Sequence, residues 1–267
     1  MVGRMGLFAR ILGLLSLYLF VGCAPTDKGL QQPSTPRIRD ENELRVGIST
    51  NAPPLIFKRG EAITGLEADF AREFSSYLSK TLRFVELEWE DQIPALLDNR
   101  IDIVMSGMSI TRLRQVRVAF STPYLRSGQM ALIRREDADR FRGGYYSIAL
   151  SESIGAVKNT TGEFFVQNRF DKPQKYFYPT AKAGVSALMR RSIDVFIHDA
   201  PMILVLASEH ETEGLTPIYT LLTEEYLAWA VRKEDVKLLN SANTFIEELT
   251  SDGRLKDMVN RWVPFTR

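Results

Sequence analysis

The densest group of anion-binding residue types follows an apolar run, in SGMSITRLRQVRVAFSTPYL at 106–125. Gly107 permits a tight turn, and Ser109 or Thr111 is suited to cap the helix that follows. The free N–H groups of a helix N-terminus attract an anion. Arg114 could reach back over the first turn and bind a carboxylate with two parallel hydrogen bonds. The stretch predicts a carboxylate-binding turn, although taken alone it also fits an ordinary helix start with solvated arginines.

A second segment repeats the pattern of the first at one constant offset. ALLDNRIDIVMSG at 95–107 and ALMRRSIDVFIHD at 187–199 share Ala-Leu, Ile-Asp and an apolar strand. We interpret this as two lobes of one design, although short apolar segments can also agree by chance. Ligands bind outside the carboxyl ends of strands in open α/β sheets. Ser106–Gly107 and His198–Asp199 are therefore predicted to face a common cleft.

Such a cleft suits an α-amino acid, which carries an ammonium group beside its carboxylate. Asp199 is placed to accept the ammonium group opposite the carboxylate-binding turn. Burying both charges is tolerable only when each has an opposite partner. The residues therefore favour a site for a small zwitterion.

The elements that must position these residues alternate along the chain from Glu43 onward. Short β-rich runs such as LRVGI, LRFVELE and IDIVMS are separated by helical patterns such as GLEADFAREFSSYLSK and IPALLD. This alternation is typical of parallel sheets flanked by helices. The predicted fold class is α/β, built as two similar α/β lobes.

Composition limits the classes of function. Of the 267 residues, 45% are hydrophobic and 25% charged, which is ordinary globular composition and excludes a disordered or fibrous chain. The net charge is +1, with Lys and Arg spread along the chain, so we expect no nucleic-acid partner. The chain has two histidines, His198 and His210, and one cysteine. We therefore expect no metal site, no cofactor and no disulfide.

The N-terminal residues have the pattern of an export signal. Arg4 and Arg10 precede an apolar run at 11–21 that has the length of a signal-peptide core and is too short to span a bilayer. We predict a signal peptide over 1–22. Residues 23–42 are polar and rich in proline, which indicates a flexible tether.

Cys23 ends the apolar run, directly after Phe20, Val21 and Gly22, and this pattern resembles the lipobox of bacterial lipoproteins. In that class the cysteine is lipidated and becomes the mature N-terminus. The resemblance predicts a periplasmic or otherwise extracytoplasmic protein, lipid-anchored to a membrane through Cys23. Cleavage beside an incidental patch of small residues is the alternative. Ala24 does not decide which membrane carries the anchor.

From about Leu44 to Val263 the chain resembles the family 3 extracytoplasmic solute-binding proteins, which deliver amino acids to ABC importers. The resemblance is carried by the order and spacing of LRVGIS with PPLIF, TGLEADFA, WEDQIPAL, SGMSITRLR with FSTPY, AVKNTTGEFF, IDVFIHDAP and ELTSDGRLKDMVNRWV. It implies two α/β lobes joined by two crossover strands, a periplasmic binding protein type II-like fold that closes by a hinge. Lobe 1 would comprise 43–132 and 222–267, and lobe 2 would comprise 133–221.

Carried over position by position, the resemblance implies the contacts to the ligand carboxylate. Gly107 and Ser109 would meet it by backbone and hydroxyl groups, and Arg114 would be its bidentate partner. Thr161 and Gly162 would close on it from the second lobe.

The same resemblance gives Asp199 the ammonium group, helped by the Ser106 carbonyl. Independently of it, Thr160 and Glu163 have the spacing of a capping box, which would present a second helix N-terminus to the cleft or be purely structural.

Three further positions bear on the cleft and its specificity. Trp89 falls where the family commonly has an aromatic wall, and Lys158 would be a cleft residue. Binders of basic amino acids usually have an acidic residue where this chain has Ser49, and often an aromatic one where it has Ala52; Leu55 replaces the usual phenylalanine. We therefore expect a neutral or uncharged polar amino acid.

Two enzyme classes compete with this interpretation. The chain also resembles the cyclohexadienyl or arogenate dehydratase branch of the superfamily, but Met202 stands where that branch has its catalytic glutamate and cannot donate a proton. GMSIT at 107–111 is similar to a serine hydrolase elbow. Adjacent strand residues point to opposite faces, however, so His198 and Asp199 would be poorly placed as base and orienting group. We predict a protein that is not an enzyme.

A ligand-sensing role without transport is a further alternative, because lobes of this family also occur in receptors and lytic enzymes. The chain ends soon after Trp262 without such a module. We therefore expect a monomer that binds a small-molecule amino acid and delivers it to an ABC transporter permease in the inner membrane.

Overall fold

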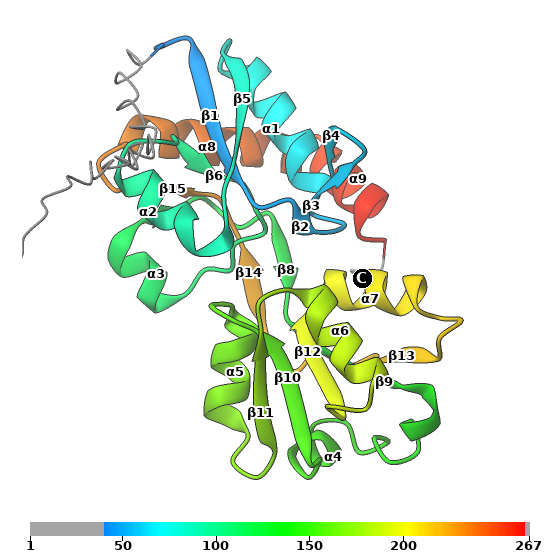
Figure 1. The fold of residues 1–267 in the computed structure, drawn as a ribbon. Helices are drawn as coiled ribbons and strands as arrows, with labels where there is room; N and C mark the ends of the chain where they lie inside the picture. The colour runs from blue at the N-terminus through cyan, green and yellow to red at the C-terminus, as the bar shows by residue number, and fades with distance from the viewer. Residues whose placement is uncertain (1–39, 265–267) are drawn as a thin grey trace, which may run out of the picture. The chain divides into compact units, whose positions relative to one another are not determined.

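Residues 40–264 are described by the structure, a computed structural model, in which the chain from Asp40 onward forms one compact unit. Two β-sheets, each flanked by helices, make two lobes (Figure 1). The α/β class and the two-lobe arrangement predicted from the sequence are confirmed. The predicted signal peptide, Cys23 and most of the tether lie outside the described residues.

The first lobe is built on a five-stranded sheet in the order β5-β1-β6-β15-β7. Its strands are β1 (Glu43–Ile48), β5 (Thr81–Glu86), β6 (Ile103–Val104), β7 (Ala119–Phe120) and β15 (Ala230–Val231), with a small sheet of β2 (Asn51–Ala52), β3 (Ile56–Arg59) and β4 (Ala62–Thr64) beside it. Its helices are α1 (Leu66–Tyr77), α2 (Gln92–Leu97), α3 (Arg112–Arg117), α8 (Val236–Ser251) and α9 (Arg254–Trp262), and η1 (Trp89–Asp91) is a 3₁₀ turn.

The second lobe repeats the plan with the order β11-β10-β12-β9-β13. Its strands are β9 (Gln129–Arg134), β10 (Ser153–Val157), β11 (Gln174–Tyr178), β12 (Val195–Asp199) and β13 (Leu215–Ile218). Its helices are α4 (Tyr145–Ala149), α5 (Thr161–Arg169), α6 (Ala181–Met189) and α7 (Ala200–Glu209), with a 3₁₀ turn η2 (Arg135–Asp137).

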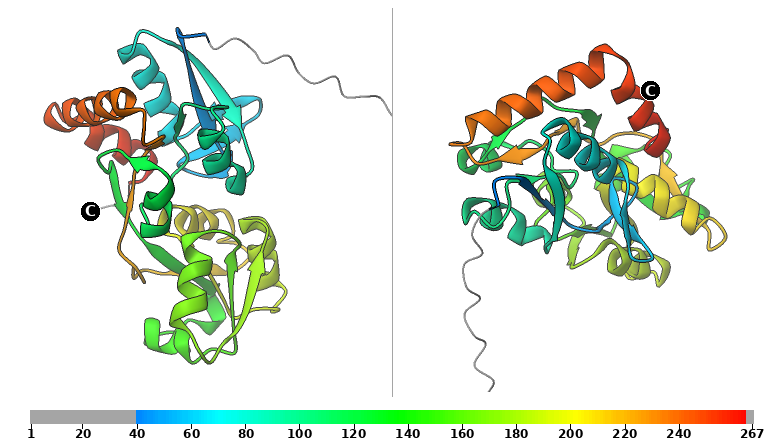
Figure 2. Two further views of the ribbon diagram at one scale, coloured as in Figure 1. Left: turned by 90° about the vertical axis from the view of Figure 1, so that its left-hand side faces the viewer. Right: turned by 90° about the horizontal axis from the view of Figure 1, so that it is seen from above.

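Two antiparallel strands, β8 (Leu125–Ser127) and β14 (Glu225–Leu227), run side by side between the lobes (Figures 1 and 2). The lobe boundary predicted between 132 and 133 falls within β9. All of β9 pairs with second-lobe strands, so the structure places this boundary before Gln129.

The internal repeat of the sequence is visible in the topology. β6 and β12 are the central strands, and each pairs with a parallel strand on one side, β1 or β10, and with an antiparallel strand on the other. The turns that precede them both contain a left-handed residue, Asn99 with φ 62° and Arg191 with φ 60°. Ser106–Gly107 and His198–Asp199 therefore occupy equivalent positions after the two central strands, as the repeat predicted.

An arginine secures the helix-to-strand turn in each lobe. Arg232 Nη1 donates to the carbonyl groups of Leu96 and Ile101, at 3.1 and 2.6 Å. Arg134 donates in the same way to the carbonyl groups of Leu188 and Ile193, at 2.9 and 2.7 Å. These contacts hold the turns that lead into β6 and β12.

Helix α1 contributes two large aromatic side chains to the first-lobe core. Phe70 and Phe74 are fully buried and pack around Trp229, with ring centroids 5.5 and 5.6 Å from it. Within residues 40–264, no helix has the length and apolar character needed to cross a membrane.

Candidate functional site

A cavity of about 260 Å³ lies at the carboxyl ends of β6 and β12 and is lined by residues of both lobes. It brings together all of the predicted site residues except Gly162: Ser49, Trp89, Ser106, Gly107, Ser109, Arg114, Lys158, Thr161 and Asp199. The rest of the polar lining consists of Asn51, Glu88, Glu90, Asn159, Thr160, Thr180 and His198.

The predicted carboxylate-binding turn has the expected local structure. Gly107 has φ +69°, and Thr111 caps α3 by accepting a hydrogen bond from the Arg114 N–H at 3.2 Å. The Arg114 guanidinium donates from Nη1 to the Ser109 carbonyl at 2.9 Å and lies 5.2 Å from the centre of the Trp89 ring. Burial lowers the pKa of Arg114, and the negative charges of Asp199 and Glu225 oppose this shift.

Two donors of this turn are engaged inside the protein and do not point freely into the cavity. The Gly107 N–H donates to Glu67 at 2.6 Å, and the Ser109 hydroxyl donates to Glu225 at 2.6 Å. The predicted contact of the Gly107 backbone N–H with the ligand therefore needs correction, because the N–H is turned towards the core.

The second-lobe loop places a helix N-terminus at the cavity. Thr160 caps α5 by accepting from the Glu163 N–H at 3.3 Å, as the capping-box spacing predicted. The Thr161 hydroxyl lines the cavity and accepts from Gln129 Nε2 at 3.1 Å. Gly162 lies behind the lining, where an added Cβ would come within 2.8 Å of Gln129 Oε1. Its close packing explains the glycine better than direct ligand contact does.

Asp199, the last residue of β12, has an environment suited to a buried acid. Its Oδ1 accepts from Gln129 Nε2 at 2.5 Å. Burial raises the pKa of Asp199, and the neighbouring Glu225 raises it further. A cationic group at this place would therefore be strongly favoured, since it would stabilise the ionised form.

His198 lines the same cavity, contrary to the strand alternation expected for two adjacent residues. Its Nδ1 accepts a hydrogen bond from the Asp199 N–H at 2.7 Å, and burial lowers its pKa. Because the Ser109 hydroxyl donates to Glu225 and not to this histidine, Ser109 and His198 do not form the hydrogen-bonded serine–histidine pair of a hydrolase.

The cavity is bridged at Trp89, whose Nε1 donates to the carbonyl of Asn159 in the second lobe at 2.8 Å. Ser49 is buried, donates from its N–H to Ser106 Oγ at 2.9 Å, and donates from its hydroxyl to Asn51 Oδ1 at 2.7 Å. Lys158 follows β10 and lines the cavity. Ser49 and Asn51 thus form a polar but uncharged part of the lining, to which Lys158 adds a cationic side chain.

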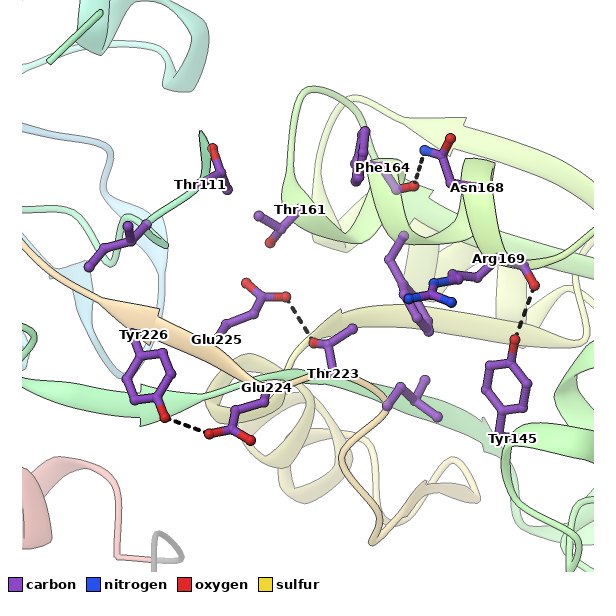
Figure 3. A pocket seen from close by; sticks show the side chains of 13 residues that line it. Thr111, Tyr145, Thr161, Phe164, Asn168, Arg169, Thr223, Glu224, Glu225 and Tyr226 are labelled. Carbon is purple, nitrogen blue, oxygen red and sulfur yellow. Dashed lines mark hydrogen bonds between the residues drawn. The ribbon is translucent and has the colours of Figure 1, made fainter. Parts of the chain in front are cut away.

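Three residues that sequence reasoning missed support the site from behind. Gln129 is fully buried and its Nε2 contacts Asp199, Thr161 and Glu225. Glu225 begins β14 and also accepts from Thr223 at 2.9 Å; Figure 3 shows it pointing away from the neighbouring Glu224. A glutamine at the start of the apolar strand β9 was the available signal for Gln129.

The third missed residue is Glu67, which is wholly buried. Its carboxylate accepts hydrogen bonds from the Gly107 N–H, the Tyr124 hydroxyl and the Trp229 indole N–H. Burial raises the pKa of Glu67 to about 7. The signal was an acidic residue on the apolar face of a helix pattern, since Glu67, Phe70, Ala71 and Phe74 have the spacing of one helical face.

A model of the bacterial extracellular solute-binding proteins, family 3, matches residues 44–265. The chain belongs to this family.

Individual relatives agree with that assignment. The L-cystine-binding protein of Escherichia coli is 24% identical over 94% of this chain and 94% of its own length. A putative ABC-transporter binding component from Wolinella succinogenes, complexed with lysine, has a TM-score of 0.79 and 28% identity over 83% of this chain and 96% of that chain. An ancestral amino acid-binding protein that is a precursor of cyclohexadienyl dehydratase has a TM-score of 0.76 and 28% identity over 83% of this chain and 95% of that chain.

Met202 bears on the dehydratase alternative, because it stands where the resemblance to that branch would place the catalytic glutamate. The side chain is 4% exposed, packs in the second-lobe core and is not part of the cavity lining. It supplies no proton donor to the cavity.

Proposed function

We propose that this solute-binding protein captures a small neutral or uncharged polar α-amino acid between its lobes and delivers it to an ABC importer. The observation that carries the proposal is the pair of partly buried opposite charges on one cavity, Arg114 from the first lobe and Asp199 from the second. Arg114, the Thr161 hydroxyl and the N-terminus of α5 would bind the carboxylate, and Asp199 the ammonium group.

The polarity of the remaining lining supports the proposed side-chain specificity. Ser49 and Asn51 bond to each other and leave an uncharged polar wall, where binders of basic amino acids would need an acid. A neutral amide or hydroxyl would find partners there. The relatives whose names specify cystine or arginine show that the family accommodates several side chains.

Thermal unfolding of the ligand-stripped chain against a panel of amino acids, prephenate and arogenate tests the proposal. A ligand at a hundred times its dissociation constant adds about 2.7 kcal/mol, which should raise the midpoint by roughly 5 to 10 °C.

Arg114→Ala and Asp199→Ala should each weaken binding by about 2–5 kcal/mol, because each leaves a charge of the bound ligand unpaired. Arg117→Ala, on the exposed face of the same helix, is the matched control.

The outcomes separate the competing functions. A shift with one or a few amino acids, lost in both cavity variants and kept in the control, would support the proposal. A shift or turnover with prephenate or arogenate alone would instead make the protein an enzyme, and wild-type affinity in either cavity variant would refute the pocket assignment.

We also propose that the protein is exported and held at a membrane through a lipid on Cys23, and that it acts as a monomer. Metabolic labelling with a radioactive fatty acid should mark the wild-type chain and leave Cys23→Ser unlabelled. An unlabelled wild-type chain of reduced mass would favour simple signal cleavage instead.

A further inference from the structure

Glu67 holds, from the protein interior, the peptide bond between two cavity-lining residues, Ser106 and Gly107. Its Oε1 accepts from the Gly107 N–H at 2.6 Å and from the Tyr124 hydroxyl at 2.5 Å, and its Oε2 accepts from Trp229 Nε1 at 2.9 Å. Glu67 has no exposed surface and lies at the start of α1. Its carboxylate therefore reaches the cavity lining through this peptide bond.

The direction of the Gly107 N–H fixes the direction of the Ser106 carbonyl. In a trans peptide the N–H and C=O groups point in opposite directions. Because the N–H points to Glu67 in the core, the carbonyl oxygen points away from the core, and both residues line the cavity. Within residues 40–264 we find no hydrogen bond to this oxygen.

The peptide is also held firmly on its other sides. Ser106 Oγ accepts from the Ser49 N–H at 2.9 Å and from Gln92 Nε2 at 3.0 Å. Gly107 adopts a left-handed φ, and a Cβ added there would come within 2.8 Å of the Leu55 side chain. The carbonyl is thus fixed in place before a ligand arrives.

A hydrogen bond from the Gly107 N–H to a carboxylate also polarises the whole amide group and makes its carbonyl a stronger acceptor. An ammonium group has three donors, and Asp199 alone does not satisfy them all in a buried site. A second, fixed acceptor is what the zwitterion requires at this wall.

We propose that Glu67 is a positioning residue for ammonium recognition, which orients and polarises the Ser106–Gly107 peptide so that the Ser106 carbonyl receives the ligand's ammonium group beside Asp199. This inference rests on the proposed amino-acid function and extends it to a residue outside the cavity.

The first test compares amino acids with the matching hydroxy acids, in which a hydroxyl group replaces the ammonium group. L-alanine and L-lactate, L-leucine and L-2-hydroxyisocaproate, and L-phenylalanine and L-phenyllactate are the probe pairs, titrated into the full chain at about pH 8 to keep Glu67 ionised. Glu67→Gln should weaken the amino acid of a binding pair by about tenfold and the hydroxy acid by no more than about threefold. An equal loss for both partners of a pair would indicate a merely structural role and overturn the proposal.

Asp69→Asn is the matched control, because Asp69 lies on the same helix and also accepts a tryptophan indole N–H, that of Trp262, at 2.8 Å. It should leave the preference for the amino acid unchanged. If Asp69→Asn reduced this preference as much as Glu67→Gln does, the proposal would be overturned as well.

A second measurement tests the hydrogen bond between Glu67 and the Gly107 N–H without any ligand. It therefore separates failure of this inference from failure of the proposed function. In a spectrum of the ¹⁵N-glycine-labelled chain, the Gly107 amide proton should resonate far downfield and move upfield in Glu67→Gln but not in Asp69→Asn. An unmoved Gly107 signal would overturn the inference even if amino acids bind.

If Glu67→Gln does not fold, the wild-type chain gives the answer. The Gly107 amide and the ¹³C-labelled Glu67 carboxyl must then titrate with one midpoint, and different midpoints would overturn the inference. Among the described residues bonded to this carboxyl, Tyr124 is the one other titratable group, and burial raises its pKa well above the usual value.

Discussion

Glu67 shows how one side chain makes the stability of this protein depend on pH. Burial raises its pKa from 4.5 to about 7, and the hydrogen bonds it accepts offset this only in part. Between those pH values the unfolded chain has lost a proton that the folded chain keeps, so stability falls as pH rises through the window. From this residue we expect a loss of about 3 kcal/mol of unfolding free energy between roughly pH 4.5 and pH 7.

The measurement is denaturant unfolding of the wild type and Glu67→Gln at several pH values across that range. Asp194, His198 and Asp199 also titrate with shifted pKa values in both proteins, so their effects cancel in the difference between the two. The difference in unfolding free energy between wild type and Glu67→Gln should change with pH. The difference between wild type and Asp69→Asn should not show the same change. A constant difference would show that Glu67 does not titrate there.

Single residues also show what can be read from sequence alone. Asp199 could be placed at the cavity because it ends an apolar strand, and Arg114 because it lies in the first turn of the helix that Thr111 caps. Glu67 and Gln129 were missed because they lie within an otherwise apolar helix face and strand, and their roles depend on which distant donors the fold brings to them. Gly162 was assigned to the ligand from the resemblance, whereas the structure places it behind the cavity, against Gln129.

At the level of elements, the crossover strand β14 affects the chemistry of the second-lobe acid. Glu225 raises the pKa of Asp199, although burial is the larger cause. Asp199 must be ionised to bind an ammonium group, so affinity should be lost as pH falls through its raised pKa. Glu225→Gln removes one charge and should move this loss of affinity to lower pH.

Binding measured against pH in the wild type, Glu225→Gln and Glu224→Gln checks this expectation. Glu224 is exposed, lies next to Glu225 on the chain and contacts Tyr226 and Arg126, so it should leave the profile unchanged. Burial lowers the pKa of His198 and the charge of Glu225 opposes this, so Glu225→Gln should move the protonation of His198 to lower pH as well, which shifts the profile in the same direction. A profile that moves to higher pH in Glu225→Gln would contradict the expectation.

The elements differed in how well sequence patterns predicted them. The two central strands and the caps at Thr111 and Thr160 were recognisable, because apolar runs and capping residues are local signals. The lobe boundary was misplaced within β9, because strand pairing between distant parts of the chain, and not local composition, decides to which sheet a strand belongs.

For the molecule as a whole, the repeated topology brings two equivalent strand ends to one cavity. The bond from Trp89 Nε1 to the Asn159 carbonyl crosses this cavity from one lobe to the other, at 2.8 Å. A bond between the lobes that closes over the ligand should slow its escape more than its entry.

Trp89→Phe deletes this bond but keeps an aromatic ring beside Arg114. Because one hydrogen bond contributes about 0.5–1.5 kcal/mol, we expect the dissociation rate to rise about two- to tenfold and the association rate to change little. Stopped-flow fluorescence with an amino acid that binds measures both rates. Trp262→Phe, which removes an indole bond to Asp69 within the first lobe, is the control and should leave the dissociation rate unchanged. A fall in association rate of the same size would instead mean that Trp89 shapes the open site, since a contact that forms only on closure cannot affect the first encounter.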